Sequence, residues 1–314
     1  MSPADTSVET AGEVVVQLGA DPGPGAAPPV ADGPAGGPAR AARLRRRPVP
    51  VGTLLAGAFL ALVAIAAVAP GLLTTHGPTE VDFRSALQPP SPKHWFGTDE
   101  SGRDLYSRVV AGSAQSLAIG LGAAVLAIGL AVLIGSVAAL ADRFTRAAVG
   151  RLIELLLAFP TLLLALLCVA VLGPSPMTQI VAVGIGTAPG YARMVRAQVV
   201  AAKVSGYVEA AVALGHSRTR ILRRHVLPNA LRPLVAVFTL AVGQAIVWAS
   251  GLSFLGLGVA PPSSEWGALL DAGRTHVTRA PWLILVPGAV IVVLALSATV
   301  VGRHVQDRLE RRDS

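Results

Sequence analysis

Metal binding is the first chemistry that the residue types allow, because the chain contains six histidines and one cysteine. Protein metal sites usually take their histidines from short, paired spacings. The histidines of this chain are scattered instead, at His76, His94, His216, His225, His276 and His304. We therefore expect no nickel centre or other metal site within this chain. With Cys168 as the single cysteine, neither an intrachain disulfide nor a cysteine-based zinc site can form.

Nucleophilic catalysis would need a serine beside a base that activates it. Ser250 and Ser253 lie toward the end of one apolar run, residues 234–259, and His304 follows the end of the next run, residues 281–301. If consecutive runs cross a membrane in opposite directions, these two ends lie on opposite sides of it, the serines outside and His304 in the cytosol. A hydrocarbon core about 30 Å thick would separate these two levels, which disfavours an intramembrane serine protease. The chain also lacks the phosphate loop G-x-x-x-x-G-K-S/T. Any energy from ATP must therefore come from another subunit.

The elements that carry these residues are long apolar segments. Hydrophobic residues make up 53% of the 314 residues and charged residues only 14%, whereas soluble globular chains are about a quarter charged. Six runs have the length of a membrane helix, at residues 48–73, 116–141, 152–172, 177–194, 234–259 and 281–301. We therefore expect an all-α integral membrane protein with six transmembrane helices. A soluble enzyme and a β-barrel are excluded.

The fourth apolar run, residues 177–194, is the weakest of the six. Gly184, Gly186 and Pro189 interrupt it, and Arg193 lies at its end. Membrane helices tolerate such residues where neighbouring helices satisfy the freed backbone groups. We therefore expect this helix to pack inside the bundle.

The basic residues indicate the topology. The net charge is +8, and cytoplasmic loops of membrane proteins collect Lys and Arg. With the N-terminus inside, 20 of the 26 Lys and Arg residues fall in cytoplasmic segments. This distribution places both termini in the cytosol and explains the positive charge without a nucleic-acid partner.

This topology divides the chain into five segments. Residues 1–47 are rich in Ala, Gly and Pro and bury too little apolar area to fold, so we expect a disordered cytosolic tail. The others are a first transmembrane helix, an extracytoplasmic segment, a core helical domain and a cytosolic C-terminal tail, at residues 48–75, 76–115, 116–303 and 304–314.

The largest cytosolic segment between two apolar runs is residues 195–232. Val204, Val208 and Val212 recur there at helical spacing and predict one apolar stripe. Gly215 follows and is expected to stop this helix, because glycine is the usual residue at a helix C-terminus. The segment is therefore amphipathic as well as basic.

A second short helix is expected after Gly215. Ser217 is placed to cap it, and Pro228 is expected to end it. Two short helices joined at a glycine form a docking surface for a partner. A helix pair lying on anionic lipid is equally compatible with the basic residues, Arg218, Arg220, Arg223 and Arg224. The residue pattern alone does not separate these two interpretations.

The same segment resembles the EAA loop of the inner-membrane permease subunits of ABC importers. Residues 209–215 read EAAVALG and are followed after nine residues by HVLP at 225–228. The general family pattern has isoleucine where this chain has His225. The sequence HVLPN at 225–229 resembles the peptide and nickel branch, and further segments resemble the second permease subunit of that branch, at residues 96–104, 158–160, 190–193, 252–258 and 280–282.

The resemblance spans residues 95–300 and implies the type I ABC importer permease fold, in the bacterial cytoplasmic membrane. It implies a half-transporter that pairs with a homologous second permease, two cytosolic ATPases and an extracytoplasmic solute-binding protein. ATP and Mg²⁺ would be bound by the ATPases, with no cofactor on this chain. The implied substrates are di- or oligopeptides, with nickel or another small solute as the alternative. A channel would differ in requiring neither ATP nor a binding protein.

In this family the EAA loop is the coupling helix that enters a cleft of the ATPase. The resemblance therefore assigns ATPase coupling to Glu209, Ala210, Ala211, Gly215, His225, Leu227 and Pro228. It implies that Glu209 anchors the loop and that Gly215 makes the sharp turn. The transport path is expected to be lined largely by Ala, Gly, Ser and Thr of the second to fifth spans.

Two charged groups outside this loop have simpler explanations than catalysis. Glu154 lies three residues after Arg151, so an ion pair is expected rather than a proton relay. Residues 99–104 form a polar outer motif, for which contact with a binding protein and a self-satisfied turn with an internal Arg–Asp pair both remain open. The outer tryptophans, Trp95, Trp266 and Trp282, are expected to anchor the chain at the headgroups.

Overall fold

The computed structural model of this chain describes residues 50–313, and the predicted tail at residues 1–47 lies outside them. The described part is helical, with an isolated bridge between Thr98 and Asp104 as its one strand-like pairing. In chain order the long helices are α1 (Val51–Val68), α2 (Leu105–Leu140), α3 (Arg143–Ala158), α4 (Thr161–Leu172), α5 (Pro176–Lys203), α9 (Leu234–Leu252) and α11 (Trp282–Asp313).

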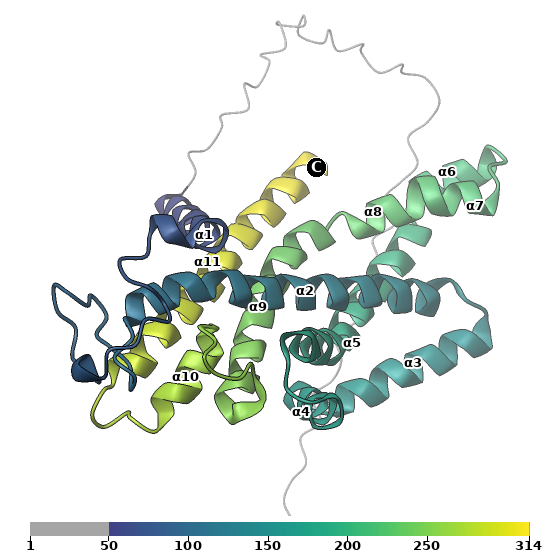
Figure 1. The fold of residues 1–314 in the computed structure, drawn as a ribbon. Coiled ribbons are helices and arrows are strands. Elements are labelled where there is room, and N and C mark those ends of the chain that lie inside the picture. The colour runs from purple at the N-terminus through teal and green to yellow at the C-terminus, as the bar shows by residue number, and fades with distance from the viewer. Residues whose placement is uncertain (1–49, 314) are drawn as a thin grey trace, which may run out of the picture. The chain divides into compact units, whose positions relative to one another are not determined.

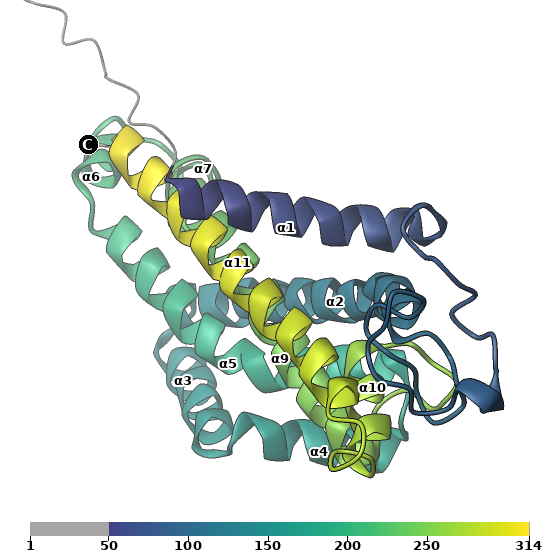
Figure 2. The same cartoon turned by 90° about the vertical axis from the view of Figure 1, so that its left-hand side faces the viewer.

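Shorter helices connect the long ones. They are η1 (Pro70–Leu72), η2 (Phe83–Ser85), α6 (Gly206–Ala213), α7 (Arg218–Ile221), the π-helical η3 (Leu222–Val226), α8 (Leu227–Leu231), the π-helical η4 (Ser253–Leu257) and α10 (Trp266–Arg274). Both views place α6 and α7 at the opposite end of the bundle from α10 and the α1–α2 loop, residues 69–104 (Figures 1 and 2).

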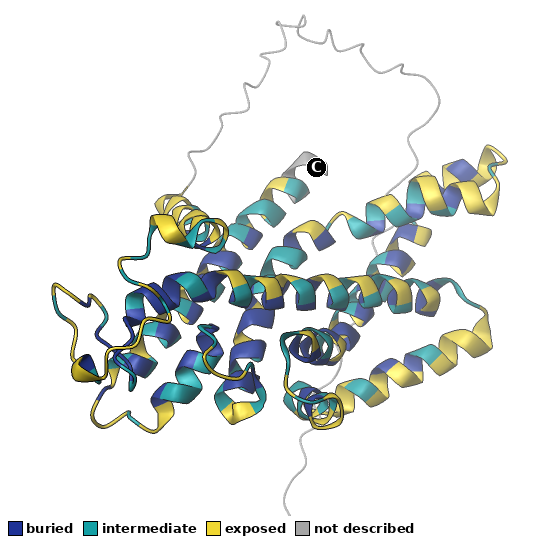
Figure 3. Cartoon of the chain, viewed as in Figure 1, coloured by how far each residue is buried: buried dark blue, intermediate teal, exposed yellow. Residues whose placement is uncertain are grey.

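Within residues 50–313, four helical segments are long and apolar enough to cross a membrane: Val51–Val68, Leu105–Leu140, Leu234–Leu257 and Trp282–Leu309. The pair α3 and α4 makes a fifth if the two count as one broken span. Exposed residues run along α1 and α3 (Figure 3), and those of α1 are apolar, as expected where lipid replaces water. The structure therefore supports four or five spans, and the count of six stays a prediction.

The predicted continuous span at residues 152–172 is wrong. The chain bends by 91° between α3 and α4, at Pro160, which precedes the first residue of α4. Proline disfavours the helical conformation of the residue before it. Phe159 accordingly has an extended backbone with φ −86° and ψ 132°.

Helix α5 packs inside the bundle, as predicted from its glycines and proline. It remains helical through Pro189 and contacts α2 along much of its length. Small residues allow this approach: a Cβ at Gly135 would lie 2.6 Å from the carbonyl oxygen of Ala192, and one at Gly184 would lie 2.8 Å from Leu126. Close backbone contact through glycine is a common way to join membrane helices.

Helix α2 begins at Leu105, earlier than the predicted start at residue 116. Asp104 caps it, since its side chain accepts a hydrogen bond of 2.8 Å from the backbone N–H of Ser107. The added turns are buried against the loop that leads into α10, where Trp266 Nε1 donates to the carbonyl oxygen of Val109 at 2.9 Å. Trp266 is fully buried, so its predicted anchoring role at the headgroups is wrong.

Glycine at position 112 is expected to be required for this packing. A Cβ there would lie 1.9 Å from the carbonyl oxygen of Ser264, whereas the same position on Gly129, also in α2, has no described atom within 4 Å. We expect Gly112→Ala to lower the stability of the purified chain by about 1–3 kcal/mol, because the backbone must move. Gly129→Ala should leave it unchanged. Equal melting temperatures for the two variants would contradict this account of the packing.

Candidate functional site

The segment that resembles the EAA loop folds into a helical hairpin, which we call the α6–α8 hairpin (residues 206–231). Helix α6 ends in a Schellman arrangement. Gly215 donates its N–H to the carbonyl of Val212 at 2.9 Å, and His216 donates to the carbonyl of Ala211 at 3.1 Å. Gly215 has φ +73°, a left-handed conformation that glycine adopts without steric cost. The prediction that Gly215 stops the first helix is confirmed.

The return arm of the hairpin begins as predicted and ends differently. Ser217 caps α7 by accepting from the backbone N–H of Arg220 at 3.4 Å. Pro228 was expected to end this helix, but α7, η3 and α8 follow one another without a break. The wider π turn accommodates the proline ring, and Asn229 Nδ2 donates to the carbonyl oxygen of His225 at 2.8 Å. That side chain satisfies a carbonyl at the irregular turn.

The predicted stripe of Val204, Val208 and Val212 is also wrong. Val208 is buried, but Val204 and Val212 are 73% and 60% exposed. Helix α6 starts only at Gly206, so Val204 precedes it, and Val208 is followed on the buried face by Ala211. These two residues pack in the same core cluster as Ile221 and Val226 of the return arm.

The exposed side of α6 carries apolar residues and one acidic residue, whereas the exposed side of the return arm is basic, with Arg218, Arg220, Arg223 and Arg224. On the α6 side, Tyr207 and Leu214 join Val212, at 42% and 75% exposure. Glu209 lies on the exposed side of α6, and its carboxylate makes no ion pair within the described residues. Exposed apolar side chains beside an unpaired carboxylate on α6 suit docking to another protein.

The structure distributes the other predicted coupling residues over both arms. Ala210, Gly215 and Pro228 are exposed, whereas Ala211 is buried between the arms. His225 and Leu227 are half-buried on the return arm. The ring of His225 stacks on that of His216 across the turn, with centroids 6.1 Å apart and planes inclined by 16°. The hairpin thus brings the predicted residues into one unit.

A second polar site lies at the other end of the bundle, where residues 99–104 form a turn with an internal Arg–Asp pair, one of the two interpretations left open by the sequence. Arg103 Nε donates to Asp99 Oδ2 at 2.7 Å and Arg103 Nη2 to Glu100 Oε1 at 3.1 Å. Arg108 of α2 pairs with the same Asp99 oxygen through Nη1. Arg108 Nη2 also donates to the carbonyl oxygen of Ser263 at 2.8 Å. Asp99 is therefore held by two arginines, one of which the sequence pattern did not indicate.

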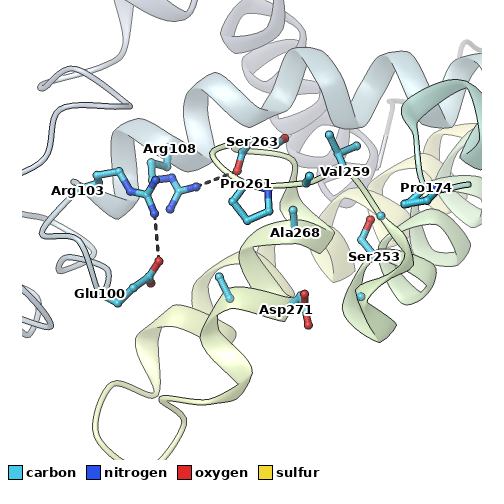
Figure 4. Close-up of a pocket in the computed structure, with 14 residues that line it drawn as sticks. Glu100, Arg103, Arg108, Pro174, Ser253, Val259, Pro261, Ser263, Ala268 and Asp271 are labelled. Atoms are coloured by element: carbon cyan, nitrogen blue, oxygen red, sulfur yellow. Dashed lines mark hydrogen bonds and ion pairs between the residues drawn. The ribbon is translucent and has the colours of Figure 1, made fainter.

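A pocket opens beside this turn (Figure 4). Arg103, Arg108 and Glu100 lie along one side, and Ser253 and Asp271 lie across from them on η4 and α10. Each of its charged side chains already makes an ion pair: Glu100 with Arg103, Arg108 with Asp99 and Asp271 with Arg274.

Glu265 and Gln179 are buried polar residues that the sequence analysis did not single out. Glu265 caps α10, accepting from the N–H groups of Gly267 and Ala268 at 2.8 Å each. Burial raises the pKa of Glu265. Gln179 Nε2 donates to Ser253 Oγ at 2.6 Å and ties α5 to η4. The sequence signal for Glu265 as a helix cap is its place directly before the helix that begins at Trp266.

Comparison with known proteins identifies the family. The family described as binding-protein-dependent transport system inner membrane component matches residues 131–312, more than half of the chain and all of the α6–α8 hairpin. The chain belongs to this family. It is therefore a permease subunit of a transport system, a multi-pass inner-membrane protein and not an enzyme. The family also implies partner subunits that supply ATP hydrolysis and bind the solute.

Curated relatives match most of the permease. The dipeptide transport system permease protein DppC of Alkalihalophilus pseudofirmus is 37% identical over 83% of this chain and 84% of its own length. The probable D,D-dipeptide transport system permease protein DdpC of Escherichia coli is 36% identical, over 82% and 87%. The glutathione transport system permease protein GsiD of Salmonella typhimurium is 38% identical, over 85% and 88%.

Solved structures share the fold of the permease at low sequence identity. A chain from inward-facing conformations of the MetNI methionine ABC transporter is 18% identical, with a TM-score of 0.54 over 66% of this chain and 96% of that chain. A chain of an amino acid ABC transporter is 17% identical, with a TM-score of 0.50 over 65% and 94%. The all-helical fold is therefore that of ABC importer permeases.

Proposed function

We propose that this permease forms half of the membrane path of an ABC importer for di- or oligopeptides. A homologous second permease would supply the other half. Two ATPase subunits would bind ATP and Mg²⁺, and an extracytoplasmic binding protein would deliver the solute. The proposed topology has six spans, with α5 as the least apolar one and with both termini and the α6–α8 hairpin in the cytosol.

The observation that carries the coupling role is the exposed face of the α6–α8 hairpin. Glu209 and the apolar side chains of Tyr207, Val212 and Leu214 are presented together at one end of the bundle. The two arms are held by a buried core and by the Schellman turn at Gly215, so the face is preorganised. A preorganised hairpin would transmit the movement of a docked ATPase to α5 and α9, the helices that flank it along the chain.

The peptide assignment is supported by the names of several relatives. They are permeases of systems for dipeptides, D,D-dipeptides, peptides and glutathione, each 36–39% identical to this chain over more than four fifths of its length. These solutes share a peptide backbone. Selectivity among them would reside mainly in the binding protein, which makes the first contact with the solute.

Uptake into proteoliposomes tests this function. We expect the complete transporter, with its binding protein, to accumulate a labelled dipeptide only when ATP is present at the ATPase side. Unlabelled di- and tripeptides should compete, and labelled Ni²⁺ should not accumulate. The binding protein should bind the same peptides in calorimetry.

Two results would overturn the proposal. Accumulation of Ni²⁺ with no peptide uptake would assign the permease to metal import. Solute flux that continues without ATP or without the binding protein would indicate a channel. Omitting the binding protein from otherwise identical vesicles is the matched control.

A further inference from the structure

Two histidines and an aspartate that are far apart in the sequence meet at the start of α2. His94 Nδ1 lies 3.0 Å from Asp104 Oδ1, and His76 Nδ1 lies 3.9 Å from Asp104 Oδ2. The two imidazole rings have centroids 4.9 Å apart. One nitrogen from each histidine and one oxygen from Asp104 all lie within 4.8 Å of one another. The two histidines are far apart in the sequence, and they come together because the α1–α2 loop folds back on α2.

We propose that His76, His94 and Asp104 form a binding site for a divalent transition-metal ion, with Zn²⁺ as the ion that fits best. Zinc–nitrogen and zinc–oxygen bonds of about 2.0–2.2 Å in a tetrahedron place neighbouring ligand atoms about 3.4 Å apart. The two His–Asp separations lie on either side of this value and are to different carboxylate oxygens, 3.0 Å from His94 to Oδ1 and 3.9 Å from His76 to Oδ2. Small side-chain rotations bring the three atoms around one ion.

The backbone around each ligand is already fixed. Ser107 Oγ accepts hydrogen bonds from the N–H groups of Thr75 and His76, at 3.3 and 3.0 Å, which holds the first ligand against α2. His94 donates its N–H to Ser91 Oγ at 3.1 Å. Asp104 is held by its capping bond to Ser107. Ligands positioned in this way lose little freedom when a metal binds.

Burial in the cluster leaves one nitrogen without a partner. The side chains of His94 and Asp104 are 7% and 1% exposed. His94 Nε2 is buried and has no hydrogen-bond partner within the part of the chain that the structure describes. His94 would coordinate the ion through Nδ1, which lies beside Asp104, so the unpaired Nε2 lies on the other side of the ring and is not the ligand atom. The His76 side chain is 31% exposed and leaves an entry route with room for a fourth, exchangeable ligand.

The ligand types select the kind of metal. Two imidazoles and one carboxylate suit zinc and other nitrogen-binding transition ions, whereas Ca²⁺ and Mg²⁺ prefer sites made of oxygen alone. The ion would connect His76 soon after α1, His94 in the middle of the α1–α2 loop and Asp104 at the N-cap of α2. It would therefore stiffen this loop, and the site does not depend on the identity of the transported solute.

Metal analysis of the complete transporter tests the site. The complex is purified through a tag without histidines, stripped with chelator, loaded with Zn²⁺ and analysed by mass spectrometry of its metal content. We expect His76→Ala to remove one Zn²⁺ per permease and to weaken binding at least ~100-fold, since even outer partners of a metal site are worth about 10–100-fold. Asp104→Asn should have the same effect while keeping the helix cap, because asparagine caps as well as aspartate.

His276→Ala is the matched control, because this histidine lies after α10, outside the cluster. It should bind zinc like the wild type. Loading with Co²⁺ gives a second readout: the wild type and the His276 variant should show visible d–d bands that the other two variants lack. Equal zinc content and equal cobalt spectra in the wild type and His76→Ala would overturn the proposal. His94 and Asp104 would then form only a hydrogen bond, without a metal ion.

Discussion

Replacing Gly215 with valine is expected to reduce peptide uptake by about tenfold or more while the permease still inserts into the membrane. The residue has φ +73°, and a left-handed backbone costs a residue with a Cβ about 1–2 kcal/mol, with β-branched side chains the least tolerated. That strain opposes the two backbone bonds that close the hairpin, from Gly215 to Val212 and from His216 to Ala211. No described atom lies within 4 Å of the position of a new Cβ. The defect should therefore come from the backbone conformation rather than from crowding.

Gly215→Asn is the control that separates conformation from side-chain size. Asparagine adopts the left-handed region more readily than other residues with a Cβ. It should retain much more uptake than valine, although both side chains project from the same turn. The measurement is ATP-driven uptake and binding-protein-stimulated ATP hydrolysis in the same proteoliposomes. Both should fall together in the valine variant, while capture of the loaded binding protein is unchanged.

Glu209→Ala should produce a smaller loss of the same two activities, because it removes the exposed carboxylate from a face whose apolar part remains. Glu154→Ala provides the comparison. Glu154 is an exposed carboxylate on α3 that pairs with Arg151 at 3.1 Å, as predicted, so its loss should have little effect on coupling.

Full coupling and normal ATPase association in Gly215→Val would show instead that the hairpin is a helix pair lying on the membrane surface.

The hairpin was predictable because its signals are local. A glycine that stops a helix and a serine that caps the next act within a few residues, and the structure confirms Gly215 and Ser217 in these roles. The errors at Pro160 and Pro228 run in opposite directions. The chain bends at Pro160, where an uninterrupted helix was expected, and it remains helical through Pro228 because the π turn at 222–226 makes room for the ring. Whether a proline ends a helix depends on such neighbouring geometry.

The polar sites at the other end of the bundle were much less predictable, because their members come from distant segments. The ion pair of Arg103 with Asp99 spans four residues and was one of two open readings, but Arg108 and the carbonyl of Ser263 join it only through folding. The cluster of His76 and His94 arises in the same way. Residue spacing along one helix or strand says nothing about contacts made by a folded loop, so the histidine spacing did not indicate that His76 and His94 lie together.

Asp99→Asn is expected to be the most destabilising single substitution at this end of the permease. Asp99 Oδ2 accepts from Arg103 Nε and from Arg108 Nη1, and the Arg108 side chain is only 3% exposed. Removing the charge that both guanidinium groups share leaves buried Arg108 without an ion pair and Arg103 with Glu100 alone, which costs about 3–5 kcal/mol. For a chain of this size that corresponds to a fall in Tm on the order of 10 °C. Thermal unfolding of the purified complex in detergent measures it.

Glu100→Gln is the matched control, because Glu100 also pairs with Arg103, at 3.1 Å, but is 36% exposed at its side chain. Solvent screens this pair, so its loss should cost no more than about 1 kcal/mol. Adding Arg108→Met to Asp99→Asn should restore part of the stability, since an apolar side chain of similar length leaves no uncompensated charge. If Asp99→Asn melts within a degree or two of Glu100→Gln, the aspartate is not the centre of the network. Rescue by methionine, in contrast, would show that the loss comes from the unpaired arginine and not from the loop bonds of Asp99 to Ser101 and Arg103.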